Sequence, residues 1–115
     1  MSDKRFVAPD ITPEQRSAAL VKAQEARQAR AKVKHRLSTG ELDPVEALDD
    51  EVVGRMPLLE FLRSLPGLGV ARARAVVEEV GTMERRRVGG LGVRQRERLV
   101  RVLRDRYGDG DARAE

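Results

Sequence analysis

The sequence predicts an all-α protein of about five helices, in which a long N-terminal helix precedes a smaller helical domain. Aromatic residues make up only 3% of the 115 residues. The core must therefore be built from Leu, Val and Ala, which is a composition that favours helices. Glycine and proline pairs divide the chain into segments whose apolar residues follow a helical spacing, and no segment alternates as a strand would. A chain of this length has room for one domain with arms.

A flexible arm is expected over residues 1–11, and a basic helix over residues 12–38. Thr12 is the predicted N-cap, with Pro13 at the first helical position and Gln15 completing a capping box. From Ala19 to Leu37, six positions recur at alternating steps of four and three residues, which indicates a narrow stripe on one face. The helix carries seven basic and two acidic residues, a net charge of +5: Arg16, Lys22, Arg27, Arg30, Lys32, Lys34 and Arg36 against Glu14 and Glu25.

The segment from Glu41 to Glu51 has the opposite character, with six acidic residues and no basic one. Its Asp43-Pro44-Val45-Glu46 sequence predicts an N-cap, a proline at the first turn and a capping glutamate. We expect one short helix that runs to about Val53 and is ended by Gly54. Carboxylates on such a helix are usually solvated, and they can also balance the basic first helix.

The densest apolar cluster follows Pro57, which opens the next helix. This cluster is the predicted centre of the core: Leu58, Leu59, Phe61, Leu62 and Leu65. A helix over residues 70–80 should bury Ala73, Val76, Val77 and Val80, with Gly81 as its C-cap. A last helix over residues 93–107 should bury Leu99, Val102, Leu103 and Tyr107, before a disordered tail at residues 108–115.

Two copies of Gly-Leu-Gly-Val, at residues 67–70 and 90–93, each open a helix. Glycine permits φ > 0 and lets another molecule approach the backbone closely. The free N–H groups and the positive dipole end of a helix N-terminus form an anion site. Ordinary helix–helix turns also use glycine as a cap, but arginine follows both copies. We therefore interpret them as two phosphate contacts that read no bases.

The charge balance agrees with a nucleic-acid partner. The net charge is +4, the isoelectric point is near 10.1, and 19 of the 23 basic residues are arginine (23 minus four lysines). Arginine forms bidentate hydrogen bonds with phosphate. The run Arg85-Arg86-Arg87 precedes the second turn, where it is either a solvated face or a phosphate contact with one arginine inserted in the minor groove. The chain has no cysteine, so disulfides and zinc frameworks are excluded, and no segment has the length and hydropathy of a membrane span.

The combined motifs resemble those of the actinobacterial integration host factors. The resemblance rests on Thr-Pro-Glu-Gln-Arg at residues 12–16, a Lys-Val-Lys helix end, Leu-Pro-Gly-Leu-Gly at 65–69 and Arg-Arg-Val-x-Gly-Leu-Gly at 86–92. It covers roughly residues 9–107. It implies a small nucleoid-associated protein whose helix–two-turns–helix domain, expected here at residues 41–107, binds and bends double-stranded DNA with little sequence preference. It also implies roles in chromosome organisation and phage integration.

The resemblance assigns DNA contacts to the first turn and to a second segment containing Arg86, Arg87 and residues 90–92. Family members commonly carry a basic residue where this chain has Gly89, so Arg85 or Arg94 is the expected substitute. With the neighbouring arginines and the basic end of the first helix, the predicted DNA-binding set is Pro66, Gly67, Leu68, Gly69, Val70, Arg72, Arg74, Arg85, Arg86, Arg87, Gly89, Gly90, Leu91, Gly92, Arg94, Lys32, Lys34 and Arg36.

Two other functions fit the sequence less well. Glycosylases use the same motif but need a catalytic second domain, so no enzymatic activity and no cofactor are expected. Structured RNA is the alternative ligand, although the chain offers no aromatic residues on which single strands could stack. The expected state is a cytoplasmic, nucleoid-bound monomer with no membrane contact, which shares its DNA with a phage integrase.

Overall fold

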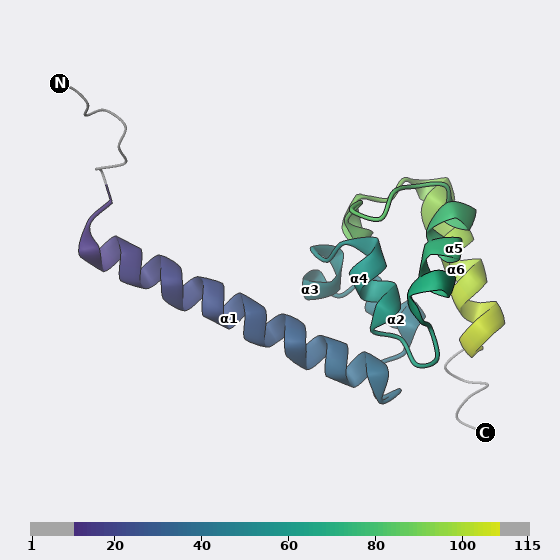
Figure 1. The fold of residues 1–115 in the computed structure, drawn as a ribbon, viewed down its shortest axis with the longest axis horizontal. Coiled ribbons are helices and arrows are strands. Elements are labelled where there is room, and N and C mark those ends of the chain that lie inside the picture. Colours follow the sequence, from purple (N-terminus) through teal and green to yellow (C-terminus); the bar gives the residue numbers. More distant parts are fainter. Residues whose placement is uncertain (1–10, 109–115) are drawn as a thin grey trace.

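The computed structural model describes residues 11–108, and these residues form an all-α fold (Figure 1). Six α-helices and one 3-10 helix follow in order: α1 Pro13–Ser38, α2 Pro44–Ala47, α3 Glu51–Gly54, α4 Leu58–Arg63, α5 Val70–Val80, η2 Val88–Gly90 and α6 Val93–Tyr107. The only β pairing within residues 11–108 is an isolated bridge between Pro57 and Arg87. The predicted all-α fold class with a long N-terminal helix is confirmed, and six α-helices are described where about five were expected. The predicted arm and tail lie outside the described residues, except for Ile11 and Gly108.

Helix α1 begins as predicted and projects from the rest of the molecule (Figure 1). The Thr12 hydroxyl accepts a hydrogen bond from the Gln15 backbone N–H, and the Gln15 side chain accepts one from the Thr12 N–H, both at 3.0 Å. Only Val33 and Leu37 of this helix are buried, whereas every residue from 11 to 28 is exposed. The predicted stripe is therefore a packing face over its last two members only, and its alanines face solvent.

The projecting helix explains the elongated shape of the protein. Its radius of gyration is 18.2 Å, whereas a compact domain of about 100 residues has a value of about 13 Å.

The acidic segment forms two short helices, so the prediction of one continuous helix was wrong. Asp43 caps α2, because its carboxylate accepts hydrogen bonds from the Val45 and Glu46 N–H groups at 3.0 and 3.1 Å. Asp50 does the same for Val52 and Val53 at 2.8 and 3.1 Å, and so starts α3. An aspartate that bonds to the N–H groups two and three residues ahead competes with a continuing helix. Helix α2 therefore ends at Ala47, and a separate helix begins after Asp50.

The core lies between the short helices, α4, α5 and α6. Phe61, Leu58 and Leu62 of α4 are fully buried, and Leu65 is 3% exposed. Leu59 is only partly buried against this cluster. All four inward residues predicted for α5 are buried, and Leu99 and Leu103 of α6 are buried with them. Val102 and Tyr107 are partly buried at the edge. The aliphatic core predicted from composition is confirmed.

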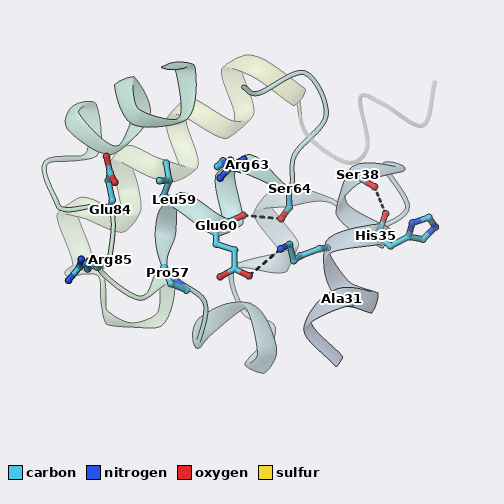
Figure 2. Close-up of a pocket in the computed structure, with 11 residues that line it drawn as sticks. Ala31, His35, Ser38, Pro57, Leu59, Glu60, Arg63, Ser64, Glu84 and Arg85 are labelled. Carbon is cyan, nitrogen blue, oxygen red and sulfur yellow. Dashed lines mark hydrogen bonds and ion pairs between the residues drawn. The ribbon is translucent and has the colours of Figure 1, made fainter. Parts of the chain in front are cut away.

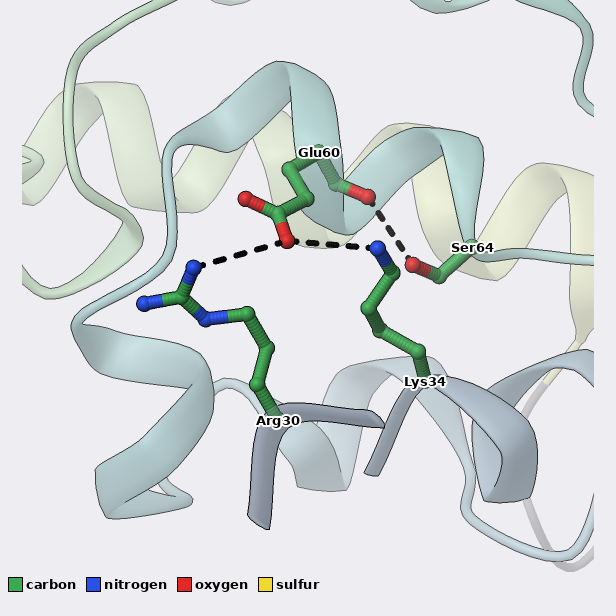
Figure 3. A network of polar contacts seen from close by, with 4 residues as sticks. All are labelled: Arg30, Lys34, Glu60 and Ser64. Carbon is green, nitrogen blue, oxygen red and sulfur yellow. Dashed lines mark hydrogen bonds and ion pairs between the residues drawn. The ribbon is translucent and has the colours of Figure 1, made fainter. Parts of the chain in front are cut away.

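The end of α1 is attached to α4 by apolar packing and by one shared carboxylate. The Glu60 carboxylate accepts a hydrogen bond from the Lys34 ammonium at 3.2 Å and lies 3.9 Å from the Arg30 guanidinium (Figure 3). The Ser64 hydroxyl donates a hydrogen bond to the backbone carbonyl of Glu60 at 2.9 Å. The side chains of Lys34 and Arg30 are 42% and 43% exposed, and such pairs contribute about 0.2–1 kcal/mol. Burial of Val33 and Leu37 therefore supplies most of the attachment.

Candidate nucleic-acid interface

The first glycine turn connects α4 to α5. Gly67 has φ +75°, a left-handed conformation that favours glycine. Gly69 is the N-cap of α5 with φ −77° and ψ 179°, an ordinary extended conformation, and a Cβ added there would meet no atom within 4 Å. Gly69 is therefore not required by the local backbone or by packing inside the protein.

Helix α5 presents unpaired backbone donors at this turn. The first backbone N–H of the helix with a recorded acceptor is that of Ala73, which donates to the Gly69 carbonyl at 2.9 Å. No acceptor within residues 11–108 is recorded for the N–H groups of Val70, Ala71 and Arg72. These donors lie at the positive end of an 11-residue helix, and Val70 is 39% exposed. The arrangement suits an oxyanion such as a phosphate.

The side chains beside this turn have different environments. Leu68 is 5% exposed and belongs to the core, so only its backbone is available to a ligand. Pro66 is exposed, and so is Arg72, which has no recorded side-chain partner in the described part of the chain. Arg74 pairs with Glu84 at 2.9 Å and is thereby connected to the loop before α6.

Two residues from the end of α6 hold the carbonyl groups of the first turn. The Tyr107 hydroxyl donates to the Pro66 carbonyl at 2.7 Å, and Arg106 donates to the Gly67 carbonyl at 3.2 Å. The sequence pattern predicts Tyr107 in the core and indicates no role for Arg106. Both bonds span about 40 residues of sequence, so no local pattern indicates them.

The second glycine turn is held from within its own loop. Arg86 donates its Nε–H to the Gly90 carbonyl at 2.9 Å. Gly92 is the N-cap of α6, and its N–H is satisfied by the Gln95 side chain at 3.0 Å. The same Gln95 donates to the Gly81 carbonyl at 2.8 Å. No acceptor within residues 11–108 is recorded for the first N–H groups of α6. Leu91, whose side chain is partly buried, precedes them.

The two turns lie at opposite ends of a helix pair. Tyr107 brings the C-terminal end of α6 to the start of α5, and Gln95 brings the N-terminal end of α6 to Gly81 at the end of α5. The two helices are therefore antiparallel. At 1.5 Å per residue, the 11 residues of α5 separate the turns by about 16 Å. The structure does not join the turns into one site, and it places one at each end of the pair.

The three arginines before the second turn differ in their contacts. Arg85 and Arg87 are exposed, and neither has a recorded side-chain partner among residues 11–108. Arg86 is exposed but fixed by its bond to Gly90. The loop itself is anchored to α4, because the Leu58 N–H donates to the Arg86 carbonyl at 2.8 Å and the Val88 N–H donates to the Met56 carbonyl at 2.9 Å. A rigid loop thus presents two free guanidinium groups.

Gly89 packs closely against the backbone of Gly54 in α3. A Cβ at this position would lie 3.0 Å from the Gly54 carbonyl oxygen and 3.3 Å from the Gly54 Cα. A side chain here would require the Gly54 backbone to move by a few tenths of an ångström. The nearest exposed basic residue after the turn is Arg94, which has no recorded side-chain partner in the described part of the molecule.

Of the three basic residues predicted at the end of α1, two are paired. Lys34 contacts Glu60 at 3.2 Å, and Arg36 contacts Glu41 at 3.4 Å. Lys32 is exposed, and no partner for it is recorded within residues 11–108. The three residues predicted to bind DNA together therefore differ, because Lys34 and Arg36 already have carboxylate partners and Lys32 has none recorded in the described part of the chain.

A shallow groove of about 870 Å³ runs between the end of α1, α4 and the loop before α6 (Figure 2). Lys34, Arg63 and Arg85 line it together with Glu60 and Glu84. Both carboxylates already have basic partners. Glu60 pairs with Lys34 and Arg30, and Glu84 pairs with Arg74. Arg63 and Arg85 are exposed and without recorded partners in the part of the chain described. The groove therefore lies between the end of α1 and the arginine loop, and both basic and acidic side chains line it.

The remaining polar residues do not gather into a metal site. The described residues contain no group of three or more His, Asp or Glu side chains placed to hold a metal ion. None of the helices within residues 11–108 combines the length and the apolar character needed to cross a membrane.

Comparison with known proteins shows the same fold and similar sequences. The family model of the S13-like H2TH domain matches residues 36–103. The integration host factor of Streptomyces coelicolor is 47% identical over 91 residues, covering 76% of this chain and 85% of that protein. The integration host factor of Mycobacterium tuberculosis is 42% identical over 96 residues, covering 80% and 91%. The structure of sIHF bound to an 8-base-pair palindromic DNA is 40% identical, with a TM-score of 0.66, and covers 71% of this chain and 97% of that chain.

Proposed function

Since this chain belongs to the integration host factor family of actinobacteria, we propose that it is a nucleoid-associated protein that binds double-stranded DNA through its phosphate backbone. The observation that carries the proposal is the start of α5. Three N–H groups for which no acceptor within residues 11–108 is recorded lie there after Gly69, where a Cβ would meet no atom within 4 Å. Backbone donors of this kind position a duplex and carry no sequence information.

The rest of the interface supports the same conclusion. Arg85 and Arg87 are held on a rigid loop about one helix length from the first turn, and the N-terminus of α6 lies beside them. The first turn would position the duplex, while the free arginines of the loop would hold a bend in it. The proposed activity is therefore DNA binding with little sequence preference, with bending as its consequence.

The wider biological role follows from this activity. We place the protein in the cytoplasm on the nucleoid, as a monomer in solution that organises chromosomal DNA. Bent DNA also brings recombination sites together, so a phage integrase acting on the same DNA is a fitting partner.

A competition titration tests the proposal. Labelled duplex DNA is bound to the full chain, then displaced by duplex DNA of unrelated sequence, by duplex RNA and by single-stranded RNA at equal salt. We expect both DNA duplexes to compete equally and better than either RNA. With about six phosphates neutralised, the logarithm of affinity should fall with log salt at a slope of about −5. Preference for RNA, or a flat salt response, would contradict the proposal.

A further inference from the structure

The outer face of α6 carries a shallow groove. Its volume is about 630 Å³, and every residue that lines it belongs to this helix. Figure 1 shows α6 on the side of the molecule away from the N-terminal half of α1. The buried residues of the helix, Leu99 and Leu103, lie about 120° around the helix from the middle of the groove. Helix α6 therefore packs into the core with one face and leaves the groove on another.

Two valines form the apolar part of the groove. Val93 is 76% exposed, and Val100 is only partly buried against the core. They are seven residues apart, which is close to two helical turns, so they lie along one line on the helix. A single exposed valine needs no explanation. Two valines aligned in one groove leave apolar surface that a second molecule can cover.

Charged residues of both signs line the groove beside the valines. Glu97 and Arg101 are four residues apart and therefore lie on the same edge of the groove. Both are exposed, and no ion pair or hydrogen bond within residues 11–108 is recorded for either side chain. The carboxylate of Glu97 would repel the phosphates of a duplex, so DNA is not the ligand that this face favours. A partner with one positive and one negative group at matching positions is.

A second copy of α6 in the antiparallel direction meets this requirement. When Glu97 of one copy lies opposite Arg101 of the other, the twofold axis also places Arg101 of the first copy opposite Glu97 of the second. The two Val100 side chains are then offset by about 3 Å along the helix axis, and each Val93 lies within about 1.5 Å of the level of Arg104 in the other copy. Long basic side chains cover apolar surface with their methylene groups. The groove is therefore complementary to itself in charge and in apolar surface.

We propose that α6 pairs with α6 of a second copy of this chain, antiparallel and through this groove, when both copies are bound to DNA. The inference rests on the proposed function, because the duplex brings the copies together. A contact made by one helix from each copy belongs to the small interfaces, below about 1,200 Å², that form weak and transient complexes. The free protein therefore stays a monomer. Two copies on one duplex have an effective concentration that reaches about the millimolar range, so a weak contact suffices there.

The antiparallel direction also suits the phosphate-binding turns. The first glycine turn lies at the C-terminal end of α6, where Tyr107 donates to the Pro66 carbonyl, and the second turn lies at the N-terminal end of α6. Antiparallel pairing therefore places the first turn of one copy beside the second turn of the other. DNA binding by the two copies should then be cooperative.

Charge reversal in the full chain tests the proposal. Glu97→Arg and Arg101→Glu each place like charges opposite one another in both halves of the pair, although they change the net charge in opposite directions. The double variant, Glu97→Arg with Arg101→Glu, restores two contacts of opposite charge and has the net charge of the unchanged protein. Residues 97 and 101 are exposed, so all three variants should unfold at a temperature similar to that of the unchanged protein.

Binding is measured on a 10-base-pair duplex, about one helical turn, and on a 40-base-pair duplex, about four turns. On the short duplex, net charge alone should act, so Glu97→Arg should bind more tightly and Arg101→Glu more weakly. On the long duplex, a gel shift should show that the second copy of the unchanged protein binds about tenfold more tightly than the first. Both single variants should reduce this factor to less than about twofold, because like charges then face each other. The double variant should restore it.

A cysteine at residue 100 tests the contact itself, because the chain contains no cysteine of its own. On the 40-base-pair duplex, a short bis-maleimide linker should join two copies of the Val100→Cys protein. Ala75→Cys is the matched control, since residue 75 is exposed on α5 and lies outside the groove. This control protein should remain uncrosslinked under the same conditions.

Cooperativity that persists in both single variants, or that the double variant fails to restore, would overturn the pairing. So would equal cross-linking of the Val100→Cys and Ala75→Cys proteins. Binding of the unchanged protein to both duplexes without cooperativity would overturn the pairing and leave the proposed function intact. Failure of the unchanged protein to bind any duplex would overturn the proposed function, and the pairing on DNA with it.

Discussion

Replacing Gly69 by threonine is expected to weaken duplex DNA binding about tenfold, which is about 1.4 kcal/mol, while leaving the folded protein as stable as before. Threonine and glycine are similar in rank as N-cap residues, and Gly69 has φ −77°, with open space around the position of a Cβ. The threonine side chain would fill the space that a phosphate needs. Its hydroxyl would also accept hydrogen bonds from the same N–H groups that would otherwise bind the phosphate. Anisotropy with duplex DNA and thermal unfolding of the same samples measure the two effects.

Gly67→Ala is the matched control in the same turn and should have the opposite signature. Its φ of +75° is a conformation that costs a residue with a Cβ about 1 kcal/mol or more. Thermal stability should therefore decrease, and the affinity of the remaining folded protein should change less than it does in Gly69→Thr. Equal affinities for Gly69→Thr and the unchanged protein would show that the turn is only a structural connection.

Removing the two free guanidinium groups of the loop is the second large effect that we expect. Arg85→Ala with Arg87→Ala breaks no recorded side-chain contact in the described structure, so unfolding should be unaffected. If each arginine neutralises one phosphate, the log–log salt slope should decrease by about 1.8, with an affinity loss of ten- to a hundredfold at low salt. The loss should be similar on duplexes of unrelated sequence. A loss confined to one sequence would indicate base recognition instead.

A variant of Arg86 in the same loop distinguishes the contribution of its charge from that of its hydrogen bond. Arg86→Lys keeps the positive charge, but lysine cannot reproduce the guanidinium Nε–H bond to the Gly90 carbonyl at 2.9 Å. If Arg86 acts by holding the turn, this variant should lose affinity and should also change the amide signals of residues 88–92 without DNA. A variant with normal affinity would show that charge alone is needed at this position.

The parts of the fold that the sequence predicts well are those set by neighbouring residues. The capping box at Thr12 and Gln15 forms as expected, because its partners are three residues apart. The inward face of α5 follows directly from the spacing of Ala73, Val76, Val77 and Val80. Gly81 ends this helix in the left-handed conformation that its position indicates.

The sequence predicts the fold wrongly where two local preferences compete, or where long-range packing determines which residues are buried. Asp43 and Asp50 are both good N-caps, and periodicity alone does not show that Asp50 interrupts the helix that Asp43 begins. The stripe along α1 reads as a packing face throughout, yet the folded domain is long enough to cover only its last part. Val33 and Leu37 are covered, whereas the alanines before them are not.

The candidate site was predictable in its position but not in its contacts. The repeated Gly-Leu-Gly-Val marks two helix N-termini, and both form. Nothing in the repeat indicates that the turns lie at opposite ends of an antiparallel pair, because that depends on how α5 and α6 pack. The pairing of Lys34 with Glu60 and of Arg106 with Gly67 likewise joins residues 26 and 39 positions apart.

The most direct test of phosphate binding at the first turn is an NMR titration of the ¹⁵N-labelled full chain with duplex DNA. We expect the amide signals of Val70, Ala71 and Arg72 to shift strongly and saturably, and to do so equally for duplexes of unrelated sequence. Saturable binding that leaves these three amides unchanged would contradict it.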